Sequence, residues 1–85
     1  MITHTSSATV AVTGAGGSLG RALVRRLVRS GHTVKALVRK KEDAAGLREL
    51  GATPVLGDVR DAGALETLVR GCQVVFHLAA WMGQP

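Results

Sequence analysis

Blocks of apolar and polar residues alternate along the chain and predict four strands and three helices. Short continuous apolar runs are separated by longer segments in which apolar residues recur every three or four positions, the spacing of one helix face. The predicted strands are residues 8–13, 32–39, 52–58 and 73–80. The predicted helices are residues 18–30, residues 42–50 and a third helix that begins after Asp61 and ends before Gly71.

The order of these elements predicts the fold class. Strands and helices alternate with connections of only a few residues, which favours a parallel sheet with right-handed crossovers and helices on both faces. The first strand, residues 8–13, is apolar or β-branched throughout, as expected of a strand buried on both faces. We therefore expect an α/β fold, a Rossmann-type doubly wound parallel sheet in which four strands alternate with three helices.

The ends of the sequence suggest how the chain is divided. Residues 1–7 are polar and precede the first strand, so we interpret them as an N-terminal extension. The sequence ends at Pro85, directly after the fourth strand, where a doubly wound fold starts its next helix. A sheet that ends there leaves an apolar edge unprotected. We expect residues 8–85 to be the amino-terminal half of a larger domain that is incomplete at its carboxyl end.

Composition limits the class of protein. With 46% hydrophobic and 20% charged residues, the chain has the composition of an ordinary globular protein. The polar start "MITHTSS" does not resemble a secretory signal, and no apolar run approaches the ~20 residues that span a bilayer. These features predict a cytoplasmic protein with no membrane partner. Cys72 is the single cysteine, which excludes an internal disulfide and a multi-cysteine metal site.

The net charge of +5 raises the question of a nucleic-acid partner. Much of the positive charge lies on one face of the first predicted helix, opposite its leucines and valines, as on a solvated helix face. The arginines of this face are Arg21, Arg25, Arg26 and Arg29. The sequence has one Trp, one Phe and no Tyr, so it lacks the stacking platforms of single-strand binders. We expect no nucleic-acid partner.

Four glycines fall within seven residues where the first strand gives way to the first helix, and three of them, Gly14, Gly17 and Gly20, form a G-x-x-G-x-x-G motif. A motif in this position is typical of dinucleotide binding. Gly14 allows a tight turn, Gly17 lets a diphosphate approach the backbone, and Gly20 lets the helix pack closely. Ser18 and Leu19 lie at the helix start, where free amide groups attract an anion. The alternative is a glycine-rich turn without a ligand.

The residues after the motif and after the second strand indicate which nucleotide binds. The third glycine is followed by arginine and alanine rather than by Lys-Ser/Thr, which excludes a P-loop nucleoside triphosphatase. In NAD sites a carboxylate near the end of the second strand binds the adenosine ribose, whereas here Arg39, Lys40 and Lys41 stand there. A guanidinium binds the 2′-phosphate of NADP. We therefore favour NADP over NAD. For Lys40 and Lys41 taken singly, a solvated loop is the alternative.

Four segments in order, "VTGAGGSLG", "ALVR", "GDVRD" and "VVFHLAA", carry a family resemblance. From residue 8 to residue 80 the chain resembles the amino-terminal half of extended or atypical short-chain dehydrogenases/reductases, the NAD-dependent epimerase/dehydratase group. The resemblance implies the NAD(P)-binding portion of an oxidoreductase or an epimerase/dehydratase. It also implies a small-molecule substrate that binds the complete protein.

The resemblance implies a role for each matching residue. The three motif glycines and the two residues at the helix start hold the pyrophosphate, and Arg39 holds the ribose phosphate. Asp58 accepts a hydrogen bond from the adenine amino group, and Val59 packs on the adenine ring. Ala79 and Ala80 line the path to the nicotinamide ribose. A simple turn residue is the alternative for Asp58.

The resemblance implies no catalytic residue within this sequence. The family's tyrosine and lysine, four residues apart, lie well beyond the fourth strand, and this sequence contains no tyrosine. We interpret His77 as a hydrogen-bonded core histidine of a buried strand rather than as a catalyst. Two alternatives to an enzyme therefore remain open: an NADP-sensing regulator without turnover, and an inactive fragment. A Tyr-x-x-x-Lys pair further along the protein would favour the enzyme.

Overall fold

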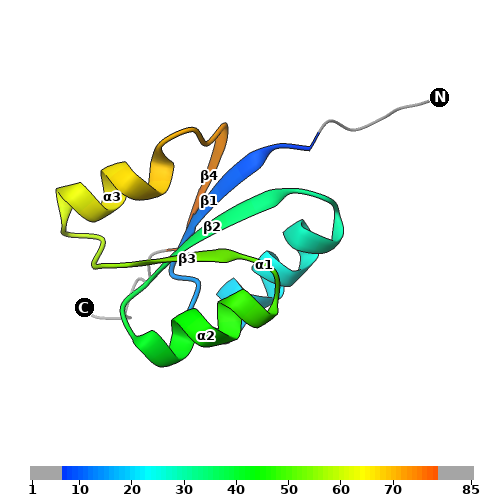
Figure 1. The fold of residues 1–85 in the computed structure, drawn as a ribbon, viewed down its shortest axis with the longest axis horizontal. Helices are drawn as coiled ribbons and strands as arrows, with labels where there is room; N and C mark the ends of the chain where they lie inside the picture. The colour runs from blue at the N-terminus through cyan, green and yellow to red at the C-terminus, as the bar shows by residue number, and fades with distance from the viewer. Residues whose placement is uncertain (1–6, 79–85) are drawn as a thin grey trace.

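A computed structural model describes residues 7–78 and shows four strands alternating with three helices (Figure 1). The expected α/β class is confirmed. The strands are β1 (Thr9–Thr13), β2 (Thr33–Val38), β3 (Thr53–Leu56) and β4 (Val74–His77). The helices are α1 (Ser18–Arg29), α2 (Lys41–Glu49) and α3 (Ala62–Val69). Ala79 and Ala80, expected to end the fourth strand, lie outside the described residues.

All three strand pairs are parallel, and the strands lie in the order β3-β2-β1-β4. In the centre of the sheet Val10 is paired with Val34 on one side and with Val74 on the other. The chain moves outward from β1 through β2 to β3 and then crosses to the opposite side of β1. The strand order therefore reverses between β1 and β4, and open parallel sheets bind ligands beside the carboxyl ends of strands at such a point.

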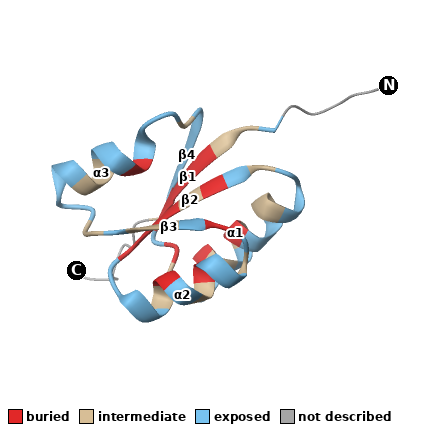
Figure 2. Cartoon of the chain, in the orientation of Figure 1, coloured by how far each residue is buried: buried red, intermediate tan, exposed pale blue. Residues whose placement is uncertain are grey.

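Two layers of helix cover the sheet, with α1 and α2 on one face and α3 on the other (Figure 1). The larger core lies under α1 and α2, and Figure 2 shows its buried residues on β1, β2 and the facing sides of these helices. It includes Val10 and Val12, whereas Ala11 packs on the other face with Leu37 and Leu68. Successive residues of β1 thus meet different helix layers, which explains why this strand is apolar at every position.

The edge strand β4 differs from the expectation of a buried strand. All four of its residues are exposed, with Val75 49% accessible and Phe76 37% accessible. The helices pack chiefly on β1, β2 and β3, so neither helix layer within residues 7–78 covers β4. His77 is consequently exposed rather than in the core, although its Nδ1 lies 2.9 Å from the hydroxyl of the buried Thr13. The prediction of a hydrogen-bonded histidine is confirmed, and the prediction of burial is wrong.

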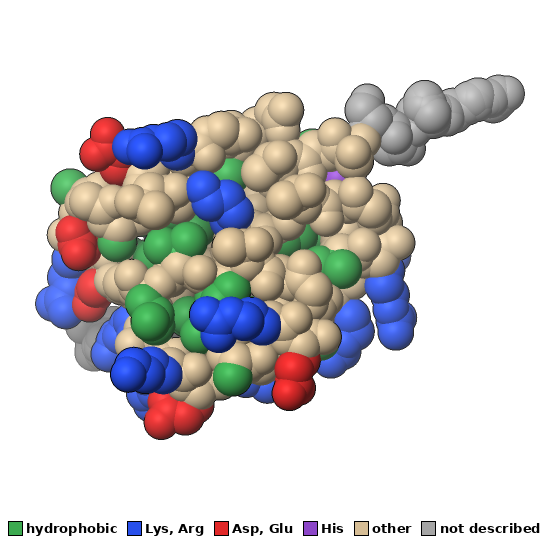
Figure 3. Space-filling model, viewed as in Figure 1, with side chains coloured by type: hydrophobic (Ala, Val, Ile, Leu, Met, Phe, Trp, Pro, Cys, Tyr) green, Lys and Arg blue, Asp and Glu red, His purple; other side chains and the backbone are tan. Residues whose placement is uncertain are grey.

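The charged residues are dispersed over the face seen in Figure 3, where acidic side chains lie among Lys and Arg. On α1, Arg25, Arg26 and Arg29 are exposed, as the helical pattern predicts. None of the helices between residues 7 and 78 is long and apolar enough to cross a membrane. The same stretch contains no group of three His, Cys, Asp or Glu residues that would hold a metal ion.

Candidate functional site

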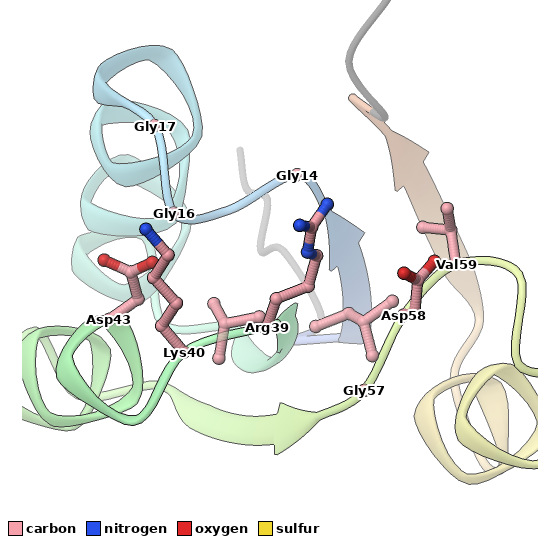
Figure 4. Close-up of a pocket in the computed structure, with 11 residues that line it drawn as sticks. Gly14, Gly16, Gly17, Arg39, Lys40, Asp43, Gly57, Asp58 and Val59 are labelled. Carbon is pink, nitrogen blue, oxygen red and sulfur yellow. The ribbon is translucent and has the colours of Figure 1, made fainter.

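A cavity of about 480 Å³ opens at the carboxyl ends of the central strands (Figure 4). Its wall combines the turn between β1 and α1, the end of β2 with the start of α2, and the loop after β3. The volume lies within the range of small-molecule pockets. The lining residues are Gly14, Gly16, Gly17, Leu37, Val38, Arg39, Lys40, Asp43, Gly57, Asp58 and Val59.

Two of the motif glycines are required by the fold itself. Gly14 has φ +72°, and a Cβ there would collide with the carbonyl oxygen of Leu78. A Cβ on Gly20 would collide with the carbonyl oxygen of Gly14 and lie 2.6 Å from the Cα of Ala15. The first helix therefore rests directly on the backbone of the turn that precedes it.

Gly17 is different, because the fold leaves space beside it. Within residues 7–78, no atom lies within 4 Å of the position that a Cβ would take, and the residue lines the cavity. Its φ of −83° and ψ of 175° are open to any residue. The bare backbone of Gly17 thus leaves room for something that enters the cavity, rather than for a neighbouring part of the fold.

The first turn of α1 leaves its amide groups available. Gly17 is the N-cap, and within the described residues no side chain caps this helix and no acidic residue lies in its first turn. The N-terminus of α3, by contrast, is closed by Asp61, whose Oδ1 accepts hydrogen bonds from the amides of Gly63 and Ala64. Free first-turn amides and the helix dipole together favour an anion at the start of α1.

Ser18 and Leu19 supply two of the amides in this turn, but their side chains do not line the cavity. The helical pattern assigned Leu19 to the apolar face, and this assignment is wrong, since Leu19 is 72% exposed. The buried residues of α1 are Gly20 and Val24. Leu23 and Leu27, one and two turns further along the same side of α1, do pack against the core, so the wrong assignment is confined to the first turn of the helix.

Two basic side chains reach the cavity from the end of β2. Figure 4 shows Arg39 directed toward Gly14 and Lys40 directed toward Gly16. Lys40 therefore belongs to the cavity wall, whereas Lys41 already begins α2 and does not line the cavity. Two cations beside a glycine-rich turn create a site that favours a phosphate group.

Asp43 is a cavity residue that no sequence motif indicates. It projects from the first turn of α2 and lies beside Gly16 and Lys40 (Figure 4). Arg21 Nη2 lies 3.6 Å from Asp43 Oδ1. The helical pattern placed Arg21 on a solvated face, and the structure shows that it also forms an ion pair with α2. No local pattern links these two residues, because they meet only where α1 and α2 lie side by side.

Asp58 and Val59 line the cavity from the loop after β3. The Asp58 carboxylate accepts three hydrogen bonds from Arg60: one from the backbone amide (2.9 Å), one from Nε (3.1 Å) and one from Nη2 (2.8 Å). The Arg60 side chain and then its amide hold the pKa of Asp58 well below its usual value, with a smaller effect from the Arg39 charge. Asp58 thus closes a turn and also presents a charged acceptor at the cavity.

Replacing Arg60 with alanine is expected to raise the pKa of Asp58 toward the ordinary value of about 3.9, because the guanidinium donors are lost. Carboxyl-carbon NMR titration measures this shift. A lowered pKa stabilises the fold above the unfolded-state pKa, and this contribution disappears as pH falls through the folded-state value. The stability difference between the two proteins should therefore be largest at neutral pH and shrink in acid. Arg70→Ala, which removes an exposed pair with Glu66, is the control and should leave Asp58 unchanged.

Half of the residues that the sequence predicts to bind the cofactor line the cavity. Those on the cavity wall are Gly14, Gly17, Arg39, Asp58 and Val59. Ser18, Leu19 and Gly20 form the adjoining first turn of α1, and Ala79 and Ala80 lie outside the described residues. Gly57 is an additional wall residue, and a Cβ there would lie 2.5 Å from the Ala64 side chain, so the β3 loop and α3 meet closely.

Comparison with known proteins identifies relatives of this chain. The model of the NmrA-like family matches residues 6–84. A 4-hydroxy-2-methyl-3-oxo-4-farnesyl-3,4-dihydroquinoline-1-oxide ketoreductase from Stigmatella aurantiaca is 46% identical over 69 residues, which cover 81% of this chain and 21% of the relative. The chain thus spans about a fifth of the length of that curated relative.

Two solved structures share the fold over most of this chain, which matches about a third of each of them. A putative NAD-dependent epimerase/dehydratase from Bacillus halodurans has a TM-score of 0.77 and 28% identity, covering 93% of this chain and 36% of that structure. The structure of AtPrR2 with NADP+ and (+)pinoresinol has a TM-score of 0.75 and 27% identity, covering 92% of this chain and 28% of its own. The chain therefore belongs to the NmrA-like family, and its resemblance to the extended short-chain dehydrogenases/reductases is confirmed.

Proposed function

We propose that the chain binds the adenosine and pyrophosphate half of NADP, as part of an oxidoreductase or an epimerase/dehydratase. The family and its structural neighbours support a nicotinamide dinucleotide as the ligand. The observation that carries the choice of NADP is the position of Arg39 and Lys40, two cations that line the cavity beside the glycine turn. AtPrR2, a structural neighbour, was solved with NADP+.

The proposal assigns one part of the cofactor to each wall of the cavity. The pyrophosphate lies against Gly17 and the free amides of the first α1 turn, where it meets the positive end of the helix dipole. The 2′-phosphate lies between Arg39 and Lys40. Adenine lies at the loop after β3, where Val59 covers its face and Asp58 accepts a hydrogen bond from its amino group. Arg60 holds that carboxylate ionised and fixed in the turn.

Asp43 is the observation that weighs against NADP, because a carboxylate in the cavity disfavours a phosphate. Its charge is met by Arg21, at 3.6 Å, and the cavity keeps Arg39 and Lys40 in addition. In an NAD site the carboxylate stands at the end of β2 itself. Here that position is occupied by arginine, so the balance of charge favours NADP.

NADPH is expected to bind at least about tenfold more tightly than NADH, since paired hydrogen bonds to the 2′-phosphate exceed 1.4 kcal/mol. Arg39→Asp should reverse the order, because the new carboxylate repels the phosphate and accepts from the ribose hydroxyl. Fluorescence titration with both cofactors measures the dissociation constants. Arg29→Asp places the same charge change on an exposed face of α1 and serves as the control. Equal constants for the two cofactors, before and after the Arg39 change, would remove Arg39 from the site.

The chemical step is proposed for the whole protein, because the chain spans only 21% of the related ketoreductase. When bound, NADPH supplies a hydride, and the residues of this chain bind and orient its adenosine half. A regulator that senses NADP without turnover would bind the same half in the same way. Single-turnover oxidation of NADPH with a panel of carbonyl compounds distinguishes the two, since only an enzyme consumes the cofactor.

A further inference from the structure

Asp43 presents a problem for a site that accepts a 2′-phosphate. Its carboxylate belongs to the cavity wall and lies beside Gly16 and Lys40 (Figure 4). Two like charges in a partly enclosed space repel each other more strongly than in water, because the effective dielectric constant is lower. An Asp43 free to turn into the cavity would therefore oppose the phosphate that Lys40 attracts.

Arg21 constrains Asp43 from the neighbouring helix. Its Nη2 lies 3.6 Å from Asp43 Oδ1, and the two side chains are only 41% and 30% exposed. The Nε of Arg21 is fully buried and has no hydrogen-bond partner within the described residues, and the guanidinium lies beside Gly46 of α2. A half-buried pair of this kind is screened less by salt than a surface pair.

Two glycines give this ion pair the space that it occupies. A Cβ on Gly16 would lie 2.9 Å from Asp43 Oδ2, and a Cβ on Gly46 would lie 2.8 Å from Arg21 Nη2. Neither glycine has a positive φ, so conformational freedom does not explain their presence. Asp43 fills the space beside Gly16, and Arg21 fills the space beside Gly46. The ion pair therefore lies between the glycine turn and α2.

We propose that Arg21 is a positioning residue for cofactor choice: by pairing with Asp43 it offsets and holds that carboxylate, so that the cavity accepts a 2′-phosphate beside Lys40. The inference rests on the proposed function and deepens it. Without Arg21, the Asp43 carboxylate is unpaired and repels the 2′-phosphate, whereas the 2′-hydroxyl of NADH is tolerated as a donor to it. Besides Asp43, the charged residues of the cavity wall are Arg39, Lys40 and Asp58.

The test compares Arg21→Met, Asp43→Asn and the double variant, each titrated with NADPH and NADH. Arg21→Met should weaken NADPH binding about tenfold and change NADH binding less than about twofold, because only NADPH meets the unpaired carboxylate. The double variant should recover the NADPH affinity of Asp43→Asn to within about twofold, since no charge is left to repel the phosphate. Arg25→Met, on the exposed face of the same helix, should change neither constant.

Adenosine 2′,5′-bisphosphate and adenosine 5′-monophosphate repeat the comparison with ligands that differ only in the 2′-phosphate. Arg21→Lys, which retains the charge, should keep most of the preference. If Arg21→Met proves unstable in urea, Asp43→Asn alone tests the inference, because it should strengthen NADPH about threefold and leave NADH unchanged. Equal weakening of both cofactors, or no recovery in the double variant, would overturn the role of Arg21. An unaltered protein that binds neither cofactor would instead refute the proposed function.

Discussion

Replacing Gly17 with valine is expected to remove most of the affinity for the dinucleotide while the protein stays folded. Among the described residues, none has an atom within 4 Å of the Cβ position of Gly17, and its backbone angles suit an L-residue, so the side chain is accommodated without strain. The isopropyl group would occupy the space through which the pyrophosphate reaches the amides of α1. We expect a loss of affinity of about 100-fold or more, corresponding to about 2.7 kcal/mol. Titration with NADPH and urea unfolding measure the two effects separately.

Gly63→Val is the matched control for this change. Gly63 lies in the first turn of α3, and a Cβ there would meet only Asp61 Oδ1, at an ordinary 3.4 Å. This variant should bind NADPH like the unaltered protein. Gly17→Ala should lose less affinity than Gly17→Val, since a methyl group blocks less of the approach. An unchanged dissociation constant for Gly17→Val would show that the cofactor does not lie against this turn.

Much of the fold is predictable from the sequence, because its local patterns agree with the tertiary arrangement. The first strand is apolar at each position since helices cover both of its faces, and Gly31 and Gly51 follow the first two helices with the positive φ values typical of helix ends. Burial of β4 was not predictable in this way. Its apolar sequence resembles that of β1, but exposure depends on which helices lie over it, and α1, α2 and α3 pack chiefly on the other three strands.

The residues of the candidate site likewise fall into those that local patterns predict and those that depend on tertiary packing. Arg39 and Asp58 were predictable because each follows a parallel strand, and the carboxyl ends of such strands meet at one edge. Lys40 was undervalued, because its sequence position does not say whether the side chain turns into the cavity or into solvent. Arg21 and Asp43 could not be paired from the sequence, since they are 22 positions apart and meet only because α1 and α2 lie on the same face of the sheet.

Replacing Gly20 with alanine is expected to have the largest effect on stability, in contrast to Gly17. A Cβ on Gly20 would collide with the Gly14 carbonyl oxygen and lie 2.6 Å from the Cα of Ala15. Both are backbone atoms at the junction of β1 and α1, so α1 would have to move away from the turn. Overpacking of this severity costs about 3 kcal/mol, a large part of the 5–15 kcal/mol that stabilises a typical domain. Urea unfolding followed by circular dichroism measures the loss.

Gly63→Ala provides the comparison for Gly20→Ala, because it makes the same substitution in a helix where the added methyl group has space. Its free energy of unfolding should equal or slightly exceed that of the unaltered protein, given the higher helix propensity of alanine. Saturating NADPH should raise the urea midpoint of Gly20→Ala but not that of Gly17→Val, because a ligand stabilises only a native state that binds it. Equal stability of the Gly20 and Gly63 variants would mean that α1 does not rest on the Gly14–Ala15 backbone.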